Sequence, residues 1–368
     1  MRSRSRSTSP IGIDFDYNEF RAIQYDRGLQ PIAIATIPRT GSRKLMPKSD
    51  EIEKLASILA QRGFTGSQVA IAVPKRSSSF HLLTLPPQGS GAPIAKLALI
   101  EAQRSGSHKT KDLQIGFWTL PTSEGASKKA SPYYTVAAET EPLNEVADCF
   151  EDVGLIPISI EPIETALTRS ASFHNEFTEK SIHAIVEFGW DCSTVVITLG
   201  STPVYTRRVE FGAARFRRQL IDDHAMPVHA INPLLNPTQV DAALSNDSSF
   251  EERRVHRIVA SILTPMLTEI ADQLDTALTY VSQQHRFAPF GVVFRTGYFS
   301  TLEQTAHSIA QRTGMPTLDL EVPVLDDPTT RATTPFESRL SPRLTIAAGL
   351  ALGAYQHSTN RSLQGAAS

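Results

Sequence analysis

The stretch IGIDFDYNEFRAIQYDRGLQPIAIATI, residues 11–37, has a counterpart in the second half of the chain, HAIVEFGWDCSTVVITLGSTPVYTRRVEF, residues 183–211. Each copy reads as three apolar strands joined by tight turns, and its opening strand ends at an acid, Asp14 in the first copy and Glu187 in the second. Tight turns present backbone N–H groups to an anion, and a carboxylate beside them can hold a hydrated metal ion. The repeat therefore predicts two similar halves that face each other across one phosphate-binding cleft.

The composition of the 368-residue chain is that of an ordinary globular protein, with room for two or three domains or for one large two-lobed unit. Its net charge of −2 gives no global field that would attract nucleic acid or lipid. Cys149 and Cys192 are too few for a disulfide framework or a zinc site, which suits a reducing cytoplasm. No apolar run approaches transmembrane length. The basic, serine-rich residues 1–10 are predicted to be a disordered tail, not a secretory signal.

Between the two copies, apolar periodicity and turn residues predict the alternating helices and strands of an α+β unit. One helix is expected to begin at Asp50, which would cap it with Glu53 completing a capping box, and to end at Gly63. A continuous apolar run at residues 69–73 predicts a buried strand. The remaining expected elements are strands at 80–83, 113–120, 133–138 and 156–161 and helices at 94–104, 141–153 and 163–174.

The chain after the second copy is predicted to be mainly helical. The longest pattern, residues 251–286, keeps one apolar stripe but contains Pro265, which predicts a kink. The stretch AAGLALGAY, residues 347–355, is rich in small residues and is expected to pack closely against other backbone. The other expected elements are a buried strand at 292–294 and helices at 211–221, 238–244 and 302–313.

Several chemistries are excluded by the absence of their motifs. The chain has no GxxxxGK[ST], GxSxG or HExxH sequence and no CxxC pair. Its 10 histidines are scattered, without metal-ligand spacing beside a carboxylate. The cluster Asp222-Asp223-His224 is interpreted as a solvated helix end, and the arginines near 207, 215–218 and 253–257 as solvated faces.

The opening IGIDFDYNEFRA resembles the phosphate motif of actin-like ATPases, and in particular the start of the type IV pilus assembly protein PilM family. Residues 69–87 and 132–171 are similar to the inserted subdomain of that family and its return into the first lobe. Residues 183–212 resemble its second phosphate motif, and the long helix and the GLALGAY ending also match. In this order the resemblance covers about nine-tenths of the chain.

The resemblance implies an α/β fold of two RNase H-like, actin-like ATPase lobes with an inserted α+β subdomain of the 1C type. The first lobe (1A) is expected to comprise residues 11–37, 154–178 and 343–360. The insertion is placed at 38–153 and the second lobe (2A and 2B) at 179–342. FtsA and the cytoplasmic domain of GspL are relatives of this family.

The resemblance also implies a site for ATP and Mg²⁺. The metal would lie at Asp14 and Glu187, and no catalytic residue is identified. The residues expected to bind the nucleotide are Asp14, Asn18, Arg21, Gly189, Ser193, Thr194, Gly212, Gly297 and Tyr298.

All three nucleotide elements depart from the family pattern. The first turn usually reads Asp-Ile-Gly-Ser-Ser and is followed by a lysine, whereas here Asp16 replaces the glycine, Tyr17 and Asn18 the serines and Arg21 the lysine. At an effective dielectric near 20, Asp16 would repel a phosphate by about a few kcal/mol. In the second turn Glu187 replaces aspartate, and the adenosine motif, at residues 295–299, keeps one glycine. These changes favour at most a weak ATPase, or a pseudo-ATPase that does not hydrolyse ATP.

The function that the resemblance implies is that of a cytoplasmic scaffold in a type IV pilus or type II secretion platform. Such a protein is recruited to the inner face of the cytoplasmic membrane, where it binds the cytoplasmic tail of a PilN-like membrane protein and other platform subunits. Neither a nucleic acid partner nor a membrane span is expected, and self-association stays open. The alternative is an active actin-fold ATPase or small-molecule kinase that uses Mg·ATP. A sugar kinase would need a catalytic aspartate before the second copy, and no aspartate in a matching context is found there.

Overall fold

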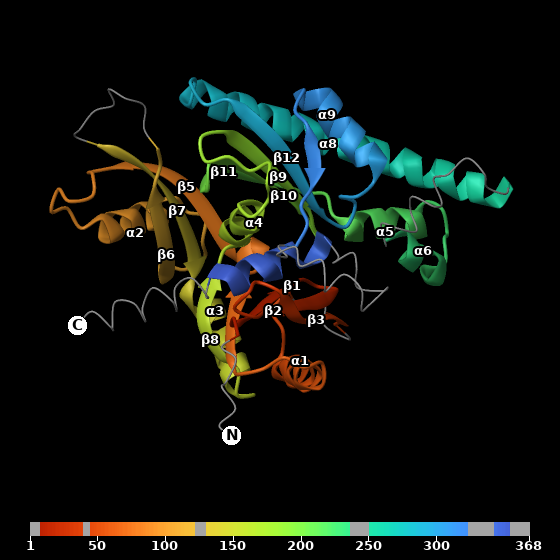
Figure 1. The fold of residues 1–368 in the computed structure, drawn as a ribbon, viewed down its shortest axis with the longest axis horizontal. Helices are drawn as coiled ribbons and strands as arrows, with labels where there is room; N and C mark the ends of the chain where they lie inside the picture. Colours follow the sequence, from red (N-terminus) through yellow and green to blue (C-terminus); the bar gives the residue numbers. More distant parts are fainter. Residues whose placement is uncertain (1–7, 40–44, 122–129, 236–249, 323–341, 354–368) are drawn as a thin grey trace.

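The computed structural model describes residues 8–39, 45–121, 130–235, 250–322 and 342–353. Within them the chain forms two five-stranded sheets and one three-stranded sheet (Figure 1). The first sheet has the order β3-β2-β1-β4-β8. Its strands are β1 (Ile11–Phe15), β2 (Glu19–Tyr25), β3 (Pro31–Pro38), β4 (Gln68–Ala72) and β8 (Ile156–Glu161). β1, β2 and β3 form an antiparallel meander, and β4 and β8 continue the sheet in parallel from β1.

The second sheet repeats this topology with the order β11-β10-β9-β12-β13. Its meander of β9, β10 and β11 is antiparallel, and β12 and β13 continue in parallel from β9. The strands are β9 (Ile182–Phe188), β10 (Ser193–Leu199), β11 (Thr202–Val209), β12 (Phe290–Gly297) and β13 (Thr317–Asp319). The shared order and strand directions confirm the predicted duplication of two similar halves.

The three-stranded sheet has the order β5-β7-β6, with all pairs antiparallel. It consists of β5 (Ser78–Leu85), β6 (Leu113–Thr119) and β7 (Ser131–Glu139), and helix α2 (Ile94–Arg104) packs against it. Leu120 and Tyr134 of this unit belong to the hydrophobic core of the second lobe. The inserted sheet is therefore docked on the second lobe as well as joined to the first.

The insertion is shorter in the structure than the expected span 38–153. Helix α1 (Ser49–Gln61) packs Ile52 and Leu55 into the core of the first sheet, and β4 is a central strand of that sheet. Helix α3 (Thr140–Glu151) contributes Val146 and Phe150 to the same core. The separate sheet is thus formed by residues 78–139 alone. Because β4 is apolar on both faces, its sequence does not indicate which sheet it joins.

Two local expectations at the ends of elements are also corrected. Helix α1 begins at Ser49, and Glu51 accepts the Lys48 N–H at 3.1 Å, so Glu51 takes the capping role that was expected of Glu53. Glu51 is held there by Arg39, whose Nη2 lies 3.0 Å from its Oε2. Ser9, within the tail predicted at residues 1–10, is buried, and its N–H donates to Tyr25 O at 2.8 Å.

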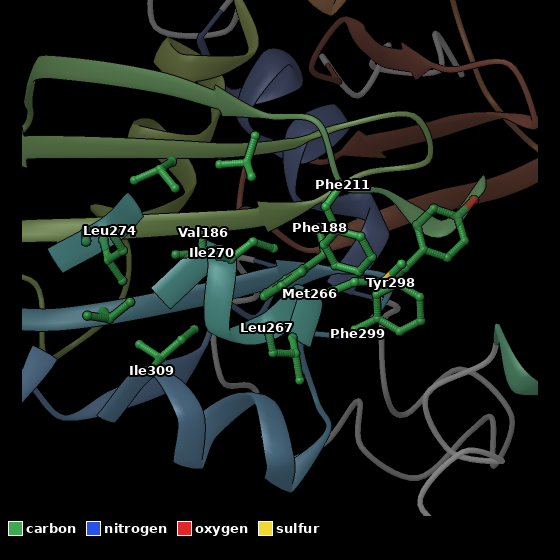
Figure 2. Close-up of a cluster of buried hydrophobic side chains, with 14 of the residues drawn as sticks. Val186, Phe188, Phe211, Met266, Leu267, Ile270, Leu274, Tyr298, Phe299 and Ile309 are labelled. Atoms are coloured by element: carbon green, nitrogen blue, oxygen red, sulfur yellow. The ribbon is translucent and has the colours of Figure 1, made fainter. Parts of the chain in front are cut away.

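Helices α8 (Phe250–Gln284) and α9 (Glu303–Thr313) cover one face of the second sheet, as Figure 2 shows for the side chains between them. Helix α8 continues through Pro265. Helices α5 (Ala213–Asp222) and α6 (Val228–Leu234) follow the second meander; α6 was not anticipated. The helix expected at 238–244 lies outside the described residues.

The two lobes share a core around helix α4 (Ile163–Ala171), which packs against β4 of the first sheet and against β9 and β10 of the second. The final helix, residues 345–353, lies against β1, and a Cβ on Gly12 would overlap the Ala347 carbonyl. The same helix touches α4, because a Cβ on Gly349 would overlap the Ala166 carbonyl. These contacts confirm the predicted close packing of the small-residue segment. No helix in the described ranges is long and apolar enough to cross a bilayer.

Candidate functional site

The two acids that end the opening strands of the meanders meet in one cleft. Asp14 lies near the end of β1 and Glu187 near the end of β9, and both strands point their carboxyl ends toward the space between the lobes. A cavity of about 10 Å³ remains there, lined by residues of both lobes that include Arg21, Glu187, Tyr298 and Arg343. Both acids therefore lie at the cleft and act on each other electrostatically. The cavity there, which Glu187 lines but Asp14 does not, is very small.

Arg21 on β2 is the centre of the first turn. The register of β1 and β2 sets Asp14 opposite Arg21, which donates to Asp14 Oδ2 from Nε at 2.9 Å and from Nη2 at 2.7 Å. Its Nη1 donates to Asp16 Oδ2 at 2.7 Å and to Glu19 Oε1 at 3.2 Å. Burial alone lowers the pKa of Arg21, but the charges of these acids raise it well above its ordinary value. Asp14 is thus bound to a permanent cation.

Asp16 closes the first turn through its other oxygen. Its Oδ1 accepts the backbone N–H of Asn18 at 2.7 Å and that of Glu19 at 3.1 Å. Backbone N–H groups in such a turn are the ones that bind an anionic ligand. Here a carboxylate of the chain itself binds them, and its side chain is buried.

Glu19 connects this turn to the segment that precedes the helix at residues 345–353. Both of its carboxylate oxygens lie 3.1 Å from Nη1 of Arg343, which belongs to the short helix η2 (Pro342–Leu344). Burial raises the pKa of Glu19, although Arg21 and Arg343 both oppose the shift. The first turn therefore forms a buried network in which every acid has an arginine partner.

Lys75 is the cation of the second turn, and the sequence analysis did not single it out. It lies in the short helix η1 (Lys75–Ser77), directly after β4 and Pro74, and its Nζ donates to both carboxylate oxygens of Glu187 at 2.7 Å. Burial by itself lowers the pKa of Lys75, but the charge of Glu187 leads the effects that raise it far above its ordinary value. A Cβ on Gly189 would overlap Lys75 Nζ, so the ammonium lies directly over the turn.

Tyr298 fills the place of the expected adenosine motif. Gly297 has a φ of +91°, and the following N–H, of Tyr298, donates to Phe188 O at 2.8 Å. The ring is buried with its centroid 5.6 Å from that of Trp190 and 5.0 Å from the guanidinium carbon of Arg343. Its hydroxyl accepts from Asn18 Nδ2 at 3.2 Å, which joins the two lobes. Burial raises the pKa of this hydroxyl, so it stays protonated.

The other expected residues support the second turn from within. Ser193 Oγ donates to Phe211 O at 2.8 Å, and Thr194 Oγ1 is buried without a hydrogen-bond partner in the described part of the chain. Gly212 precedes α5, and a Cβ there would overlap the Trp190 carbonyl. The first N–H groups of α5, on residues 213 and 214, donate to the carbonyls of residues 189 and 190. This helix N-terminus, which in principle favours an anion, is thus already satisfied.

These residues do not fit Mg·ATP as they are arranged. Magnesium is bound through carboxylate oxygens and water, yet Asp14 Oδ2 is bound by Arg21 and both carboxylate oxygens of Glu187 are bound by Lys75. A pocket for a ligand of this size measures about 300–1,000 Å³, far more than the cavity between the lobes. The described residues also contain no cluster of three or more His, Cys, Asp or Glu side chains able to hold a metal ion.

The comparisons with known proteins agree with the two-lobed fold. A family model described as type IV pilus assembly protein PilM matches residues 28–355. A solved "PilM-PilN type IV pilus biogenesis complex" is similar to the chain with a TM-score of 0.74 and 15% identity, over 95% of this chain and 99% of that one.

Weaker structural similarities extend to other proteins. Ethanolamine utilization protein EutJ from Carboxydothermus hydrogenoformans has a TM-score of 0.49 and 12% identity, over 94% of this chain and 89% of that one. The activator of the 2-hydroxyisocaproyl-CoA dehydratase from Clostridium difficile with bound ADPNP has a TM-score of 0.46 and 12% identity, over 97% of each chain. No curated protein sequence matches the chain. Because the family model covers residues 28–355, the chain belongs to the type IV pilus assembly protein PilM family.

Proposed function

We propose that this PilM-family protein is a cytoplasmic scaffold of a type IV pilus platform, or of a related type II secretion platform, and that it binds the cytoplasmic tail of a PilN-like membrane protein. The observation that carries the proposal is the similarity to the PilM-PilN complex, which extends over 95% of this chain with a TM-score of 0.74. A tail bound in this way recruits the protein to the inner face of the membrane.

Strand β8 is our candidate for the tail-binding edge. It is an edge strand of the first sheet. In the chain it follows helix α3, which comes directly after the inserted sheet. Ile156 and Ile158 are 51% and 39% exposed, and Ile158 lies where the pairing of β8 with β4 is irregular, between Pro157 and Ser159. An extended peptide that adds to such an edge gains main-chain hydrogen bonds, and alternate side chains give it specificity.

The test is calorimetric titration of the full chain with a synthetic peptide that corresponds to the N-terminal cytoplasmic tail of a PilN-like protein from the same organism. We expect Ile158→Lys to weaken binding at least tenfold, because a charged side chain would be buried under the tail. Ile32→Lys is the matched control, since Ile32 is 42% exposed on β3, the opposite edge strand of the same sheet. Absence of binding by the wild-type chain would refute the proposed partner.

We further propose that the scaffold works without nucleotide, as a pseudo-ATPase. The support is the filled cleft, in which Asp14 and Glu187 are ion-paired with Arg21 and Lys75. Mg·ATP is therefore expected to change the affinity for the tail less than twofold and to leave the melting temperature unchanged. A stabilisation of several degrees by Mg·ATP would instead favour the active ATPase or kinase, because a ligand that binds the folded state stabilises it by mass action.

A further inference from the structure

At each of the two turns of the cleft, a charged side chain of the protein makes the contacts that a bound ion would make. In the first lobe, the Asp16 carboxylate accepts two backbone N–H groups of its turn and a guanidinium nitrogen of Arg21. In the second lobe, the Lys75 ammonium lies over the Gly189 turn and donates to both oxygens of Glu187. The first group has the charge and hydrogen-bond partners of an anionic ligand, and the second those of a bound cation.

The Lys75–Glu187 pair also crosses between the lobes. Lys75 follows β4 of the first sheet, whereas Glu187 belongs to β9 of the second. The next residue, Arg76, spans the same gap with Nε 3.0 Å from Asp191 Oδ2 and Nη2 2.6 Å from Glu210 Oε2. Arg76 is half-exposed, so water screens its two ion pairs, whereas both members of the Lys75–Glu187 pair are buried.

We propose that Lys75 is a built-in cation that takes the metal position between Asp14 and Glu187, so that the lobes close on each other without a ligand. The two acids are the only negative side chains that the proposal needs, and both act electrostatically on Lys75. If the ammonium is removed, the buried Glu187 loses the charge that most opposes the rise of its pKa. The neighbouring carboxylate, Asp14, stays paired with Arg21 through Oδ2. That arrangement attracts a hard divalent cation, because Mg²⁺ prefers carboxylate oxygens and retains water on its other sides.

This role of Lys75 concerns the cleft alone and does not depend on the proposed scaffold function or on tail binding. A Cβ at Gly189 would overlap both the Lys75 nitrogen and the Cys192 carbonyl, so the glycine is required by the turn itself as well as by the lysine. Asp16 has a corresponding role in the first turn, where its carboxylate takes the hydrogen bonds that a phosphate would otherwise receive.

The test is the thermal unfolding of the full chain in EDTA and in millimolar Mg²⁺, for the wild type and four variants. The wild type and Lys75→Arg, which keeps the cation, are expected to melt at the same temperature in both solutions. Lys75→Ala and Lys75→Met, which remove the charge with and without loss of bulk, are expected to melt lower in EDTA and to regain several degrees with Mg²⁺. The double variant K75M/E187Q, which removes one of the two acids, is expected to lose the response to Mg²⁺.

The proposal would be overturned by no response to Mg²⁺ in either charge-removing variant, by a wild-type response as large as theirs, or by a response that persists in K75M/E187Q. A charge-removing variant that precipitates in EDTA but stays soluble in Mg²⁺ supports the proposal, whereas one that precipitates in both solutions contradicts it. Because the measurement involves no tail peptide, failure here leaves tail binding standing, and failure of tail binding leaves this inference standing.

Discussion

Gly297 controls how the end of β12 meets the second turn of the cleft. Its φ of +91° lies in the left-handed region, and a Cβ there would overlap the Phe188 carbonyl. We expect Gly297→Ala to lower the free energy of unfolding by about 2–5 kcal/mol, since a left-handed conformation costs an alanine about 1–2 kcal/mol and steric overlap adds about 1–3 kcal/mol. Gly66→Ala is the control for the backbone cost, because Gly66 has a φ of +76° with open space around its Cβ position. Urea denaturation of both variants checks the difference; equal losses would show that the overlap is relieved.

His183 makes stability depend on pH at the far end of β9. Its ring stacks on Phe177 with centroids 4.6 Å apart, and its Nδ1 accepts the Val292 N–H at 3.2 Å. Burial lowers the pKa of His183, although hydrogen bonds to Thr178 and Val292 and the charge of Glu179 oppose the shift. The unfolded chain therefore binds this proton more readily, so stability is full above the unfolded pKa of about 6.5 and falls as the pH drops below it.

The measurement for His183 is the free energy of unfolding in urea at pH 7.5 and at pH 5.5. We expect His183→Gln to lose less stability on acidification than the wild type, by up to about 1 kcal/mol per pH unit. Some dependence will remain, because burial also lowers the pKa of His81 and His285. Identical pH profiles for wild type and variant would exclude His183 as a source.

The residues of the cleft were predictable in part. The sequence indicated Asp14 and Glu187 as facing acids because both end equivalent strands. Lys75 escaped notice because its partner, Glu187, is 112 residues away and the local pattern KRSSS shows only a break after a strand. One signal could have found it, since residues that directly follow parallel strands of one sheet converge at its carboxyl edge. The effect of Asp16 was judged from charge alone, and its hydrogen bonds to the turn depend on backbone geometry that composition does not reveal.

At the scale of elements, helix α8 contains a proline, Pro265, and stays helical on both sides of it because its apolar face is packed against the second sheet. Pro265 lies on the solvent side of a 35-residue helix, beside the buried Met266 and Leu267. A proline inside a helix removes one hydrogen bond and costs about 3 kcal/mol. We therefore expect Pro265→Ala to raise the free energy of unfolding by about 1–3 kcal/mol. Thermal and urea unfolding check this, with the exposed Thr268→Ala as a control for surface substitution in the same helix. A destabilised Pro265→Ala protein would show that a bend at this position is needed to follow the sheet.

The order of helices and strands could largely be predicted from the sequence. The sheet to which each strand belongs was harder to predict. Apolar runs, turn residues and the internal repeat located the two meanders, whose strands pair with neighbours adjacent in sequence. Strand β4 joins β1 and β8 through long connections, and its burial pattern is the same in any central position, so its sheet could not be assigned from its residues. The cap of α1 was misplaced by two residues because Arg39, 12 residues before Glu51, selects the acid that caps.

At the scale of the whole molecule, the inserted sheet and the second lobe are joined by hydrogen bonds and a common hydrophobic core, although they are separate in sequence. Trp118 Nε1 on β6 donates to Pro203 O at 2.8 Å, and Arg208 on β11 donates to Ser78 O at 2.9 Å. Leu120 and Tyr134 complete the core of the second lobe. Together with the Lys75–Glu187 pair and the shared core around α4, these contacts join the first lobe, the inserted sheet and the second lobe.

This arrangement predicts that the insertion and the second lobe unfold together, although chains of this size often unfold in several steps. The two tryptophans of the chain report on the two parts: Trp118 lies on the inserted sheet, and Trp190 lies beside Tyr298 in the cleft. In the single-tryptophan variants Trp190→Phe and Trp118→Phe, we expect the fluorescence transition in urea to coincide with the far-ultraviolet circular dichroism transition of the same variant. Trp118→Phe should lower stability by about 1 kcal/mol more through its lost hydrogen bond, without splitting the transition. If Trp118 in the Trp190→Phe variant reports an earlier transition than circular dichroism does, the inserted sheet opens on its own, and the lobes are then held together only by α4 and the cleft.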